Sequence, residues 1–215
     1  MRPTNVAKRR PNFNHAIRAL LRDIVGRTPK FKHVRPSRIL VVAGEARRAS
    51  RGTVRPLTFA GGLSTDKRGR KKPVVRYRGK RMLYLVTLRP LFFRASDPDQ
   101  RIRTVLHELF HISNRFDGTL HQGRRHARLG KEFSARLRPI VRKYLRECPP
   151  EIRAPFAHDG EVRMLQWLER PGPTDEPGKS SRRVYTEEQL FFGTVRMISR
   201  RARAARSARP RIKLH

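Results

Sequence analysis

Apolar residues recur at steps of three and four along three stretches of the chain, a spacing that places them on one face of an α-helix. We expect helices at about residues 12–25, 98–112 and 131–146. Pro139 lies inside the third stretch and is expected to kink or break that helix, because proline lacks the backbone N–H that an interior position needs. Each helix should pack one face on a common core.

Shorter runs of β-branched and aliphatic residues predict strands. Residues 38–43 form one such run, and residues 74–78 and 82–88 flank Gly79-Lys80, which predicts a hairpin. Residues 51–72 are rich in glycine, proline, lysine and arginine, which favours a loop or an open hairpin. Further along, the pattern predicts a strand over residues 161–167, a capping box at 186–189 and a strand-like alternation at 191–197.

The length of 215 residues suits one core domain with an extension. We expect the core domain to span residues 1–150 and a basic, partly disordered C-terminal extension to span residues 151–215. The mixture of elements predicts an α+β fold. Its expected parts are an N-terminal helix, a small mixed or antiparallel sheet, the helix at 98–112 and a following helix.

The charge of the chain is far from that of an ordinary soluble enzyme. Lys and Arg total 52 against 17 Asp and Glu, giving a formal net charge of +35. Such a charge predicts an anionic neighbour.

The single cysteine excludes an internal disulfide and a cysteine-rich zinc module, and no apolar stretch approaches the roughly 18–20 residues of a membrane-spanning helix. We therefore expect a cytoplasmic protein, associated with the nucleoid if its anionic neighbour is DNA.

The helix at 98–112 carries the strongest chemical signal in the sequence. It begins with a predicted cap at Asp97 and Gln100, and near its end stand His107, Glu108 and His111 in an HExxH arrangement. Residues four apart share a helix face, so the two imidazoles can converge on one ion while the carboxylate reaches a water beside it. This pattern predicts a zinc hydrolase site with Glu108 as the catalytic residue and the two histidines as metal ligands.

A catalytic zinc commonly takes three protein ligands, so a third is expected downstream of the motif. His126 is the preferred candidate because it precedes the helix at 131–146, from which its side chain could be fixed and aimed back at the site. His121, Glu132 and Asp117 remain open as alternatives.

A family resemblance lies within about residues 100–135. It is carried by Leu106 to Ser113, Phe116-Asp117-Gly118, Gly123-Arg124-Arg125-His126 and Phe133. These residues resemble the phage-type metallopeptidase family and, more distantly, the SprT-like zincins. In those families a histidine in the loop after the motif helix is the third ligand and an aromatic residue follows it, which implies these roles for His126 and Phe133. Ala127 departs from the glycine that often follows that histidine in SprT-like proteins.

The resemblance implies a zincin-like metallopeptidase domain that holds Zn²⁺ and cleaves a protein or peptide substrate. Glu108 would take the proton of the attacking water, and the substrate would add as a strand beside residues 82–88 or a neighbouring strand. The group that stabilises the oxyanion stays open among Tyr77, Tyr84, Tyr144, Arg124 and Arg125.

Two basic clusters, at residues 66–81 and 196–213, predict sequence-independent contact with nucleic acid. Together with the motif they indicate a peptidase that acts on nucleic-acid-associated proteins, as SprT-like relatives do. Two other classes remain: a basic nucleic-acid-binding protein with a structural zinc site, in which Glu108 would be dispensable, and a non-peptidase zinc hydrolase.

Overall fold

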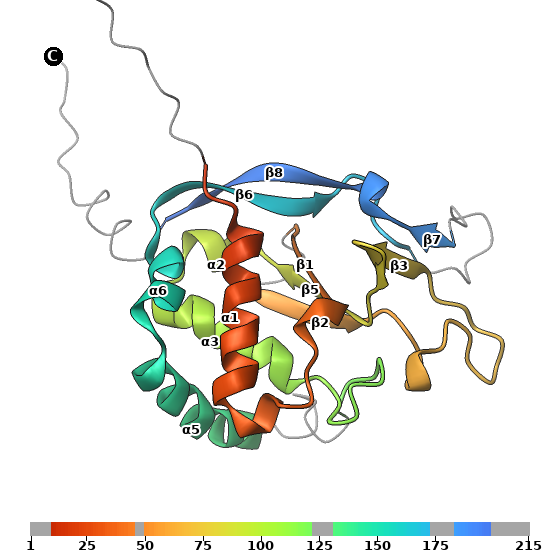
Figure 1. Ribbon diagram of the computed structural model, residues 1–215, viewed down its shortest axis with the longest axis horizontal. Coiled ribbons are helices and arrows are strands. Elements are labelled where there is room, and N and C mark those ends of the chain that lie inside the picture. Colours follow the sequence, from red (N-terminus) through yellow and green to blue (C-terminus); the bar gives the residue numbers. More distant parts are fainter. Residues whose placement is uncertain (1–9, 46–49, 122–130, 173–182, 199–215) are drawn as a thin grey trace, which may run out of the picture.

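The computed structural model describes residues 10–45, 50–121, 131–172 and 183–198. Its helices are α1 (Phe13–Arg27), α2 (Pro90–Arg94), α3 (Pro98–Phe110), α5 (Lys131–Glu147) and α6 (Pro150–Arg153). Its strands are β1 (Ile39–Ala43), β2 (Gly52–Pro56), β3 (Val74–Tyr77), β4 (Lys80–Arg81), β5 (Tyr84–Leu88), β6 (Gly160–Trp167), β7 (Val184–Tyr185) and β8 (Leu190–Met197). The α+β class predicted from the pattern is confirmed, and Figure 1 shows the helices gathered below the β6 and β8 ribbon.

The three predicted helices are present, and their ends follow local chemistry. Asn12 caps α1 by accepting the backbone N–H of His15. Asp97 and Gln100 form the predicted capping box of α3, each side chain accepting the backbone N–H of the other residue. The helix α5 is continuous from Lys131 to Glu147, so Pro139 does not end it.

The central sheet has the strand order β1-β5-β2, with β5 parallel to β1 and antiparallel to β2. The stretch predicted as a loop or open hairpin therefore contains a strand, β2, whose only aliphatic side chain is that of Val54. A strand with so few apolar residues is hard to predict from the sequence, because β2 is held in its extended conformation by pairing with β5 and not by a local pattern. It also follows that residues 82–88 form the middle of the sheet and not its edge.

The strand β1 is buried along its whole length because the sheet is covered on both faces. Ile39, Val41 and Ala43 belong to a core shared with α1, α3 and α5, whereas Leu40 and Val42 belong to a second cluster with residues of β3, β5, β6 and β7. This two-sided burial explains the uninterrupted apolar run.

The remaining strands form a small sheet, β4-β3-β7, and an antiparallel pair, β6-β8. The predicted hairpin turns at Arg78-Gly79, one residue earlier than expected, with φ angles of 53° and 69°. Two consecutive residues with positive φ make the type of tight turn that follows the twist of a hairpin. The predicted strands near 161–167 and 191–197 are confirmed as β6 and β8.

Asn14 joins the β6-β8 pair to the central sheet. Its buried side chain donates to the carbonyl of Val41 in β1 and accepts from the backbone N–H of Leu165 in β6, both at 2.7 Å. Phe156, Val162, Met164 and Met197 also lie in the main core. The division at residue 150 stays a prediction, but the described residues after it are packed on the residues before it.

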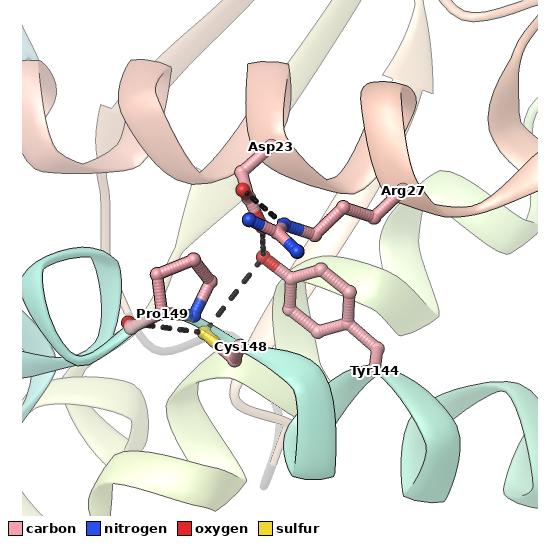
Figure 2. A network of polar contacts seen from close by, with 5 residues as sticks. All are labelled: Asp23, Arg27, Tyr144, Cys148 and Pro149. Atoms are coloured by element: carbon pink, nitrogen blue, oxygen red, sulfur yellow. Dashed lines mark hydrogen bonds and ion pairs between the residues drawn. The ribbon is translucent and has the colours of Figure 1, made fainter.

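A polar network connects α1 to α5 (Figure 2). The hydroxyl of Tyr144 donates to Asp23 at 2.6 Å, and Asp23 also accepts from Arg27 at 2.7 Å. The buried thiol of Cys148 contacts the Tyr144 hydroxyl at 3.9 Å. These contacts fix the position of α5, the helix whose first turn carries Phe133.

No helix in the described ranges is both long enough and apolar enough to span a bilayer.

Candidate metal centre

The two motif histidines lie one helical turn apart at the C-terminal end of α3. His107 is in the last turn of the helix, and His111 is the residue that caps it. Their Nε2 atoms are 3.3 Å apart, so both rings present the same nitrogen to one point in space. The predicted convergence of the imidazoles is therefore a feature of the folded chain.

This spacing fits a shared metal ion. Two nitrogens that each lie about 2.0–2.1 Å from one ion at a tetrahedral angle are about 3.3 Å apart. Neutral imidazole nitrogens are common ligands of zinc in proteins. The donor type and the separation of the Nε2 atoms of His107 and His111 thus both match a tetrahedral zinc site.

Phe133, from the first turn of α5, packs on both histidines. Its ring is stacked on His111 with a centroid distance of 4.7 Å and an interplanar angle of 19°, and it meets His107 edge to face at 4.9 Å. Phe133 is itself 1% exposed. Because the ring is fixed in the core, it restricts the orientations of both imidazoles and makes one side of the centre apolar.

Glu108 is 5% exposed and lies against the strand β2. The backbone N–H of Val54 donates to its carboxylate, and a Cβ added to Gly52 would lie 3.2 Å from its Oε1 atom. Burial raises the pKa of Glu108 to about 7, and the Val54 N–H and the charge of Arg89 act in the opposite direction. A cation beside the imidazoles would also favour the ionised form.

The four candidates for a third ligand differ in what the structure shows. His126 lies outside the described residues. His121 lies beside the motif, because its backbone N–H donates to the carbonyl of His111 at 2.8 Å. Asp117 accepts from the hydroxyl of Thr119 at 2.6 Å, and Glu132 is exposed and pairs with Arg136. Within the described ranges, no three metal-binding side chains come together.

The tyrosines considered for the oxyanion are engaged elsewhere in the fold. The Tyr84 hydroxyl donates to the carbonyl of Thr119 and accepts from the N–H of Gly118, and burial raises its pKa to about 12. Tyr144 donates to Asp23, and Tyr77 is buried with its ring beneath Arg18. Arg124 and Arg125 lie outside the described residues.

The contact between Glu108 and β2 is the part of the site that sequence reasoning missed. Gly52 and Val54 lie in a stretch whose composition favours a loop, so no periodic signal placed them beside the motif helix. The glycine itself was the available clue, because a backbone that approaches a buried side chain closely leaves no room for a Cβ atom.

A comparison with protein families gives a match over much of the chain. A family model described as putative phage metallopeptidase matches residues 13–144, which include α1, the central sheet, α3 and most of α5. Neither the curated proteins nor the solved structures contain a match to this chain.

Proposed function

Because the chain belongs to the putative phage metallopeptidase family, we propose that it is a zinc-dependent peptidase whose metal ligands are His107, His111 and His126. The observation that carries the proposal is the 3.3 Å separation of the Nε2 atoms of His107 and His111. When bound there, zinc supplies a lowered pKa for a coordinated water and polarises the scissile carbonyl.

Glu108 is the general base of this proposal. Its carboxylate is one residue from a ligand, is held by the Val54 N–H and is shielded from bulk solvent. In that position it would remove the proton of the attacking water and return it to the leaving amine. A carboxylate that is already fixed by a backbone donor loses little conformational entropy when it adopts the productive orientation.

The strand β2 is the proposed binding edge for the peptide. It is the outer strand of the central sheet on the side of Glu108, and it pairs with β5 along its other edge. An extended peptide could add alongside it through main-chain hydrogen bonds to the outward carbonyls of β2, while the Val54 N–H stays with Glu108. Such a peptide would pass the motif helix near Gly52, where the absence of a Cβ lets the backbone of β2 approach Glu108 closely.

His126 remains the proposed third ligand, with His121 as its competitor. The contacts of Asp117 with Thr119 and of Glu132 with Arg136 favour a histidine over either carboxylate. We expect His126→Ala to lose most of the bound zinc, and His15→Ala, which removes an exposed histidine, to keep it. Loss of zinc from His121→Ala together with full zinc in His126→Ala would reverse the assignment.

The first test compares zinc content and peptide cleavage in the wild type and in Glu108→Gln. The proposal requires about one zinc per chain in both proteins and cleavage only by the wild type. Glu147→Gln is the matched control, because the same substitution is then made at an exposed residue of α5. If the zinc site were only structural, Glu108→Gln would have the same activity as the wild type. If the wild type hydrolysed an ester substrate but no peptide substrate, the non-peptidase class would be favoured.

The proposed substrates are proteins bound to nucleic acid. Around the β3 and β4 hairpin, Lys67, Arg68, Arg70, Lys71, Arg76, Arg78 and Lys80 are all exposed. Tyr77 is buried among them, so this surface would contact phosphates by charge and not bases by stacking. The second cluster, at 196–213, lies almost wholly outside the described residues.

The nucleic-acid contact is tested by cleavage of a basic DNA-binding protein with and without single-stranded DNA. We expect faster cleavage with DNA at low salt, and a loss of this gain when Arg76, Arg78 and Lys80 are changed together to Gln. Equal rates with and without DNA at every salt concentration would remove nucleic acid from the proposal and leave the peptidase intact.

A further inference from the structure

A cavity lies where the parallel strands β1 and β5 both end. Its lining includes Arg89, whose charge also acts on Glu108 of the motif. Its volume is about 540 Å³, and it is bounded by the residues after these strands, by α2 and by the β6-β8 pair. Thr53 of β2 lines this cavity, whereas the neighbouring Gly52 lies against Glu108. Side chains of adjacent strand residues point to opposite faces, so the cavity and the metal centre use opposite faces of β2.

Four arginines line the cavity against one glutamate, Glu45. They are Arg89 after β5, Arg94 at the end of α2, Arg170 after β6, and Arg196 in β8. Within the described part of the chain, no carboxylate forms an ion pair with Arg89, Arg94 or Arg196. The cavity therefore concentrates positive charge from three separate segments, since Arg89 and Arg94 stand at the two ends of α2.

Two of the lining side chains have buried donors that meet no acceptor among the residues that the structure describes. They are the Nε and Nη1 atoms of Arg89 and the indole Nε1 of Trp167. Buried donors are costly to leave unpaired, and in native proteins almost all of them meet an acceptor. The hydroxyls of Thr53, Thr87 and Thr194 add further polar groups to the same walls.

We propose that this cavity binds a phosphate group. A phosphate offers three or four acceptor oxygens in a tetrahedral arrangement and close to two negative charges, which suits donors that converge from several segments. A carboxylate has two oxygens in one plane and would leave part of this set unused. The phosphate can belong to a small phosphorylated molecule or to a nucleic-acid chain, and the cavity is large enough for a nucleotide.

Trp167 allows a direct test because it is the only tryptophan in the protein. Its emission is followed during titration of the full chain with inorganic phosphate, against sodium chloride at equal ionic strength and against acetate. We expect a saturable change with phosphate alone. Absence of saturation, or equal saturation with acetate, would overturn the proposal.

The matched variants are Arg94→Gln, which removes an exposed arginine of the cavity, and Arg142→Gln, which removes an exposed arginine of α5. Loss of a charged hydrogen bond should weaken phosphate binding about tenfold in Arg94→Gln. Arg142→Gln should change it by less than about twofold, since that side chain is outside the cavity. Equal weakening in both variants would show a general effect of charge and overturn the proposal.

Calorimetry of Trp167→Phe gives an independent measurement, because this change removes the indole N–H and keeps an aromatic ring. We expect severalfold weaker phosphate binding. Unaltered affinity in Trp167→Phe would exclude the indole donor and overturn the assignment of the site.

The source of the phosphate is distinguished by two further ligands, a nucleoside monophosphate and a 5′-phosphorylated oligonucleotide. Tighter binding of the oligonucleotide, lost in Arg94→Gln, would assign the cavity to nucleic acid. Equal affinities would assign it to a small phosphorylated molecule. Oligonucleotide binding that is insensitive to Arg94→Gln and leaves Trp167 emission unchanged would contradict the cavity proposal.

Discussion

The two ends of α3 each bury a charged side chain, but they treat it in opposite ways. Near the start of the helix, Arg101 is 0% exposed and donates to five backbone carbonyls. These belong to Phe92, Phe93, Phe156, His158 and Ile198. Near the end of the helix, Glu108 has the Val54 N–H as its backbone donor and follows His107 directly in the chain.

The difference agrees with a structural role for burial at the start of α3 and with the proposed chemical role of Glu108 at its end. Arg101 has its donors taken up by carbonyls from three separate segments, so it holds α2, the residues after α6 and the end of β8 on the motif helix. Burial lowers the pKa of Arg101 to about 10, which leaves it charged at neutral pH. Glu108 has a raised pKa and few partners, which is the state expected of a group that exchanges protons.

The largest expected effect comes from Glu108→Gln. A general base contributes about 10²–10⁴ in rate, so we expect kcat/KM to fall about a thousandfold. The free energy of unfolding should change by less than about 1 kcal/mol, because the amide oxygen can still accept the Val54 N–H. Kinetics and urea unfolding of the same samples check both parts. A large loss of stability would mean that this end of α3 is structural as well.

Arg101→Met should have the opposite effect, a large loss of folding stability. It removes the donors that bind five backbone carbonyls, three of them in buried contacts, and we expect the free energy of unfolding to fall by about 3–5 kcal/mol. Urea unfolding measures this loss. Arg103→Gln, an exposed arginine two residues away, is the control and should stay within about 0.5 kcal/mol of the wild type. If both variants were equally stable, the carbonyl contacts of Arg101 would not hold the segments together.

Phe133→Leu tests the apolar wall of the metal centre. Substitution of this buried ring should cost about 1–2 kcal/mol of folding stability, and looser imidazoles should weaken zinc binding about tenfold. A competitive chelator titration gives the affinity. Leu137→Ala, one turn along the buried face of α5, is the control for a general core effect. If Leu137→Ala weakened zinc binding as much as Phe133→Leu at a similar loss of stability, the contacts of the Phe133 ring with the histidines would have no separate role in zinc binding.

Gly52→Ala gives the smallest expected change. The added Cβ would lie 3.1 Å from Thr104 Cγ2 and 3.2 Å from Glu108 Oε1, so these side chains must shift by a few tenths of an ångström. We expect kcat to fall about three- to tenfold at unchanged zinc content. Gly26→Ala places a Cβ in open space and should leave kcat as in the wild type. Unchanged kcat in Gly52→Ala would show that the approach of β2 to Glu108 is not needed.

Local patterns in the sequence were enough for the helices and for the spacing inside the motif. The apolar positions of α1, the capping box of α3 and the four-residue step from His107 to His111 each depend on residues close together in the chain. These features follow from helix geometry and capping chemistry, which act over one or two turns. The HExxH pattern therefore indicated a pair of converging ligands before any tertiary contact was considered.

The tertiary structure alone decided what surrounds that pair. Val54 reaches Glu108 from a strand with no clear strand pattern, Phe133 reaches the histidines from α5, and Arg101 binds carbonyls as far away as Ile198, 97 positions along the chain. A buried arginine looks like a surface arginine in the sequence, since its carbonyl partners carry no residue-specific signal. Contacts of this kind depend on how distant segments pack, and the local period of side chains does not record them.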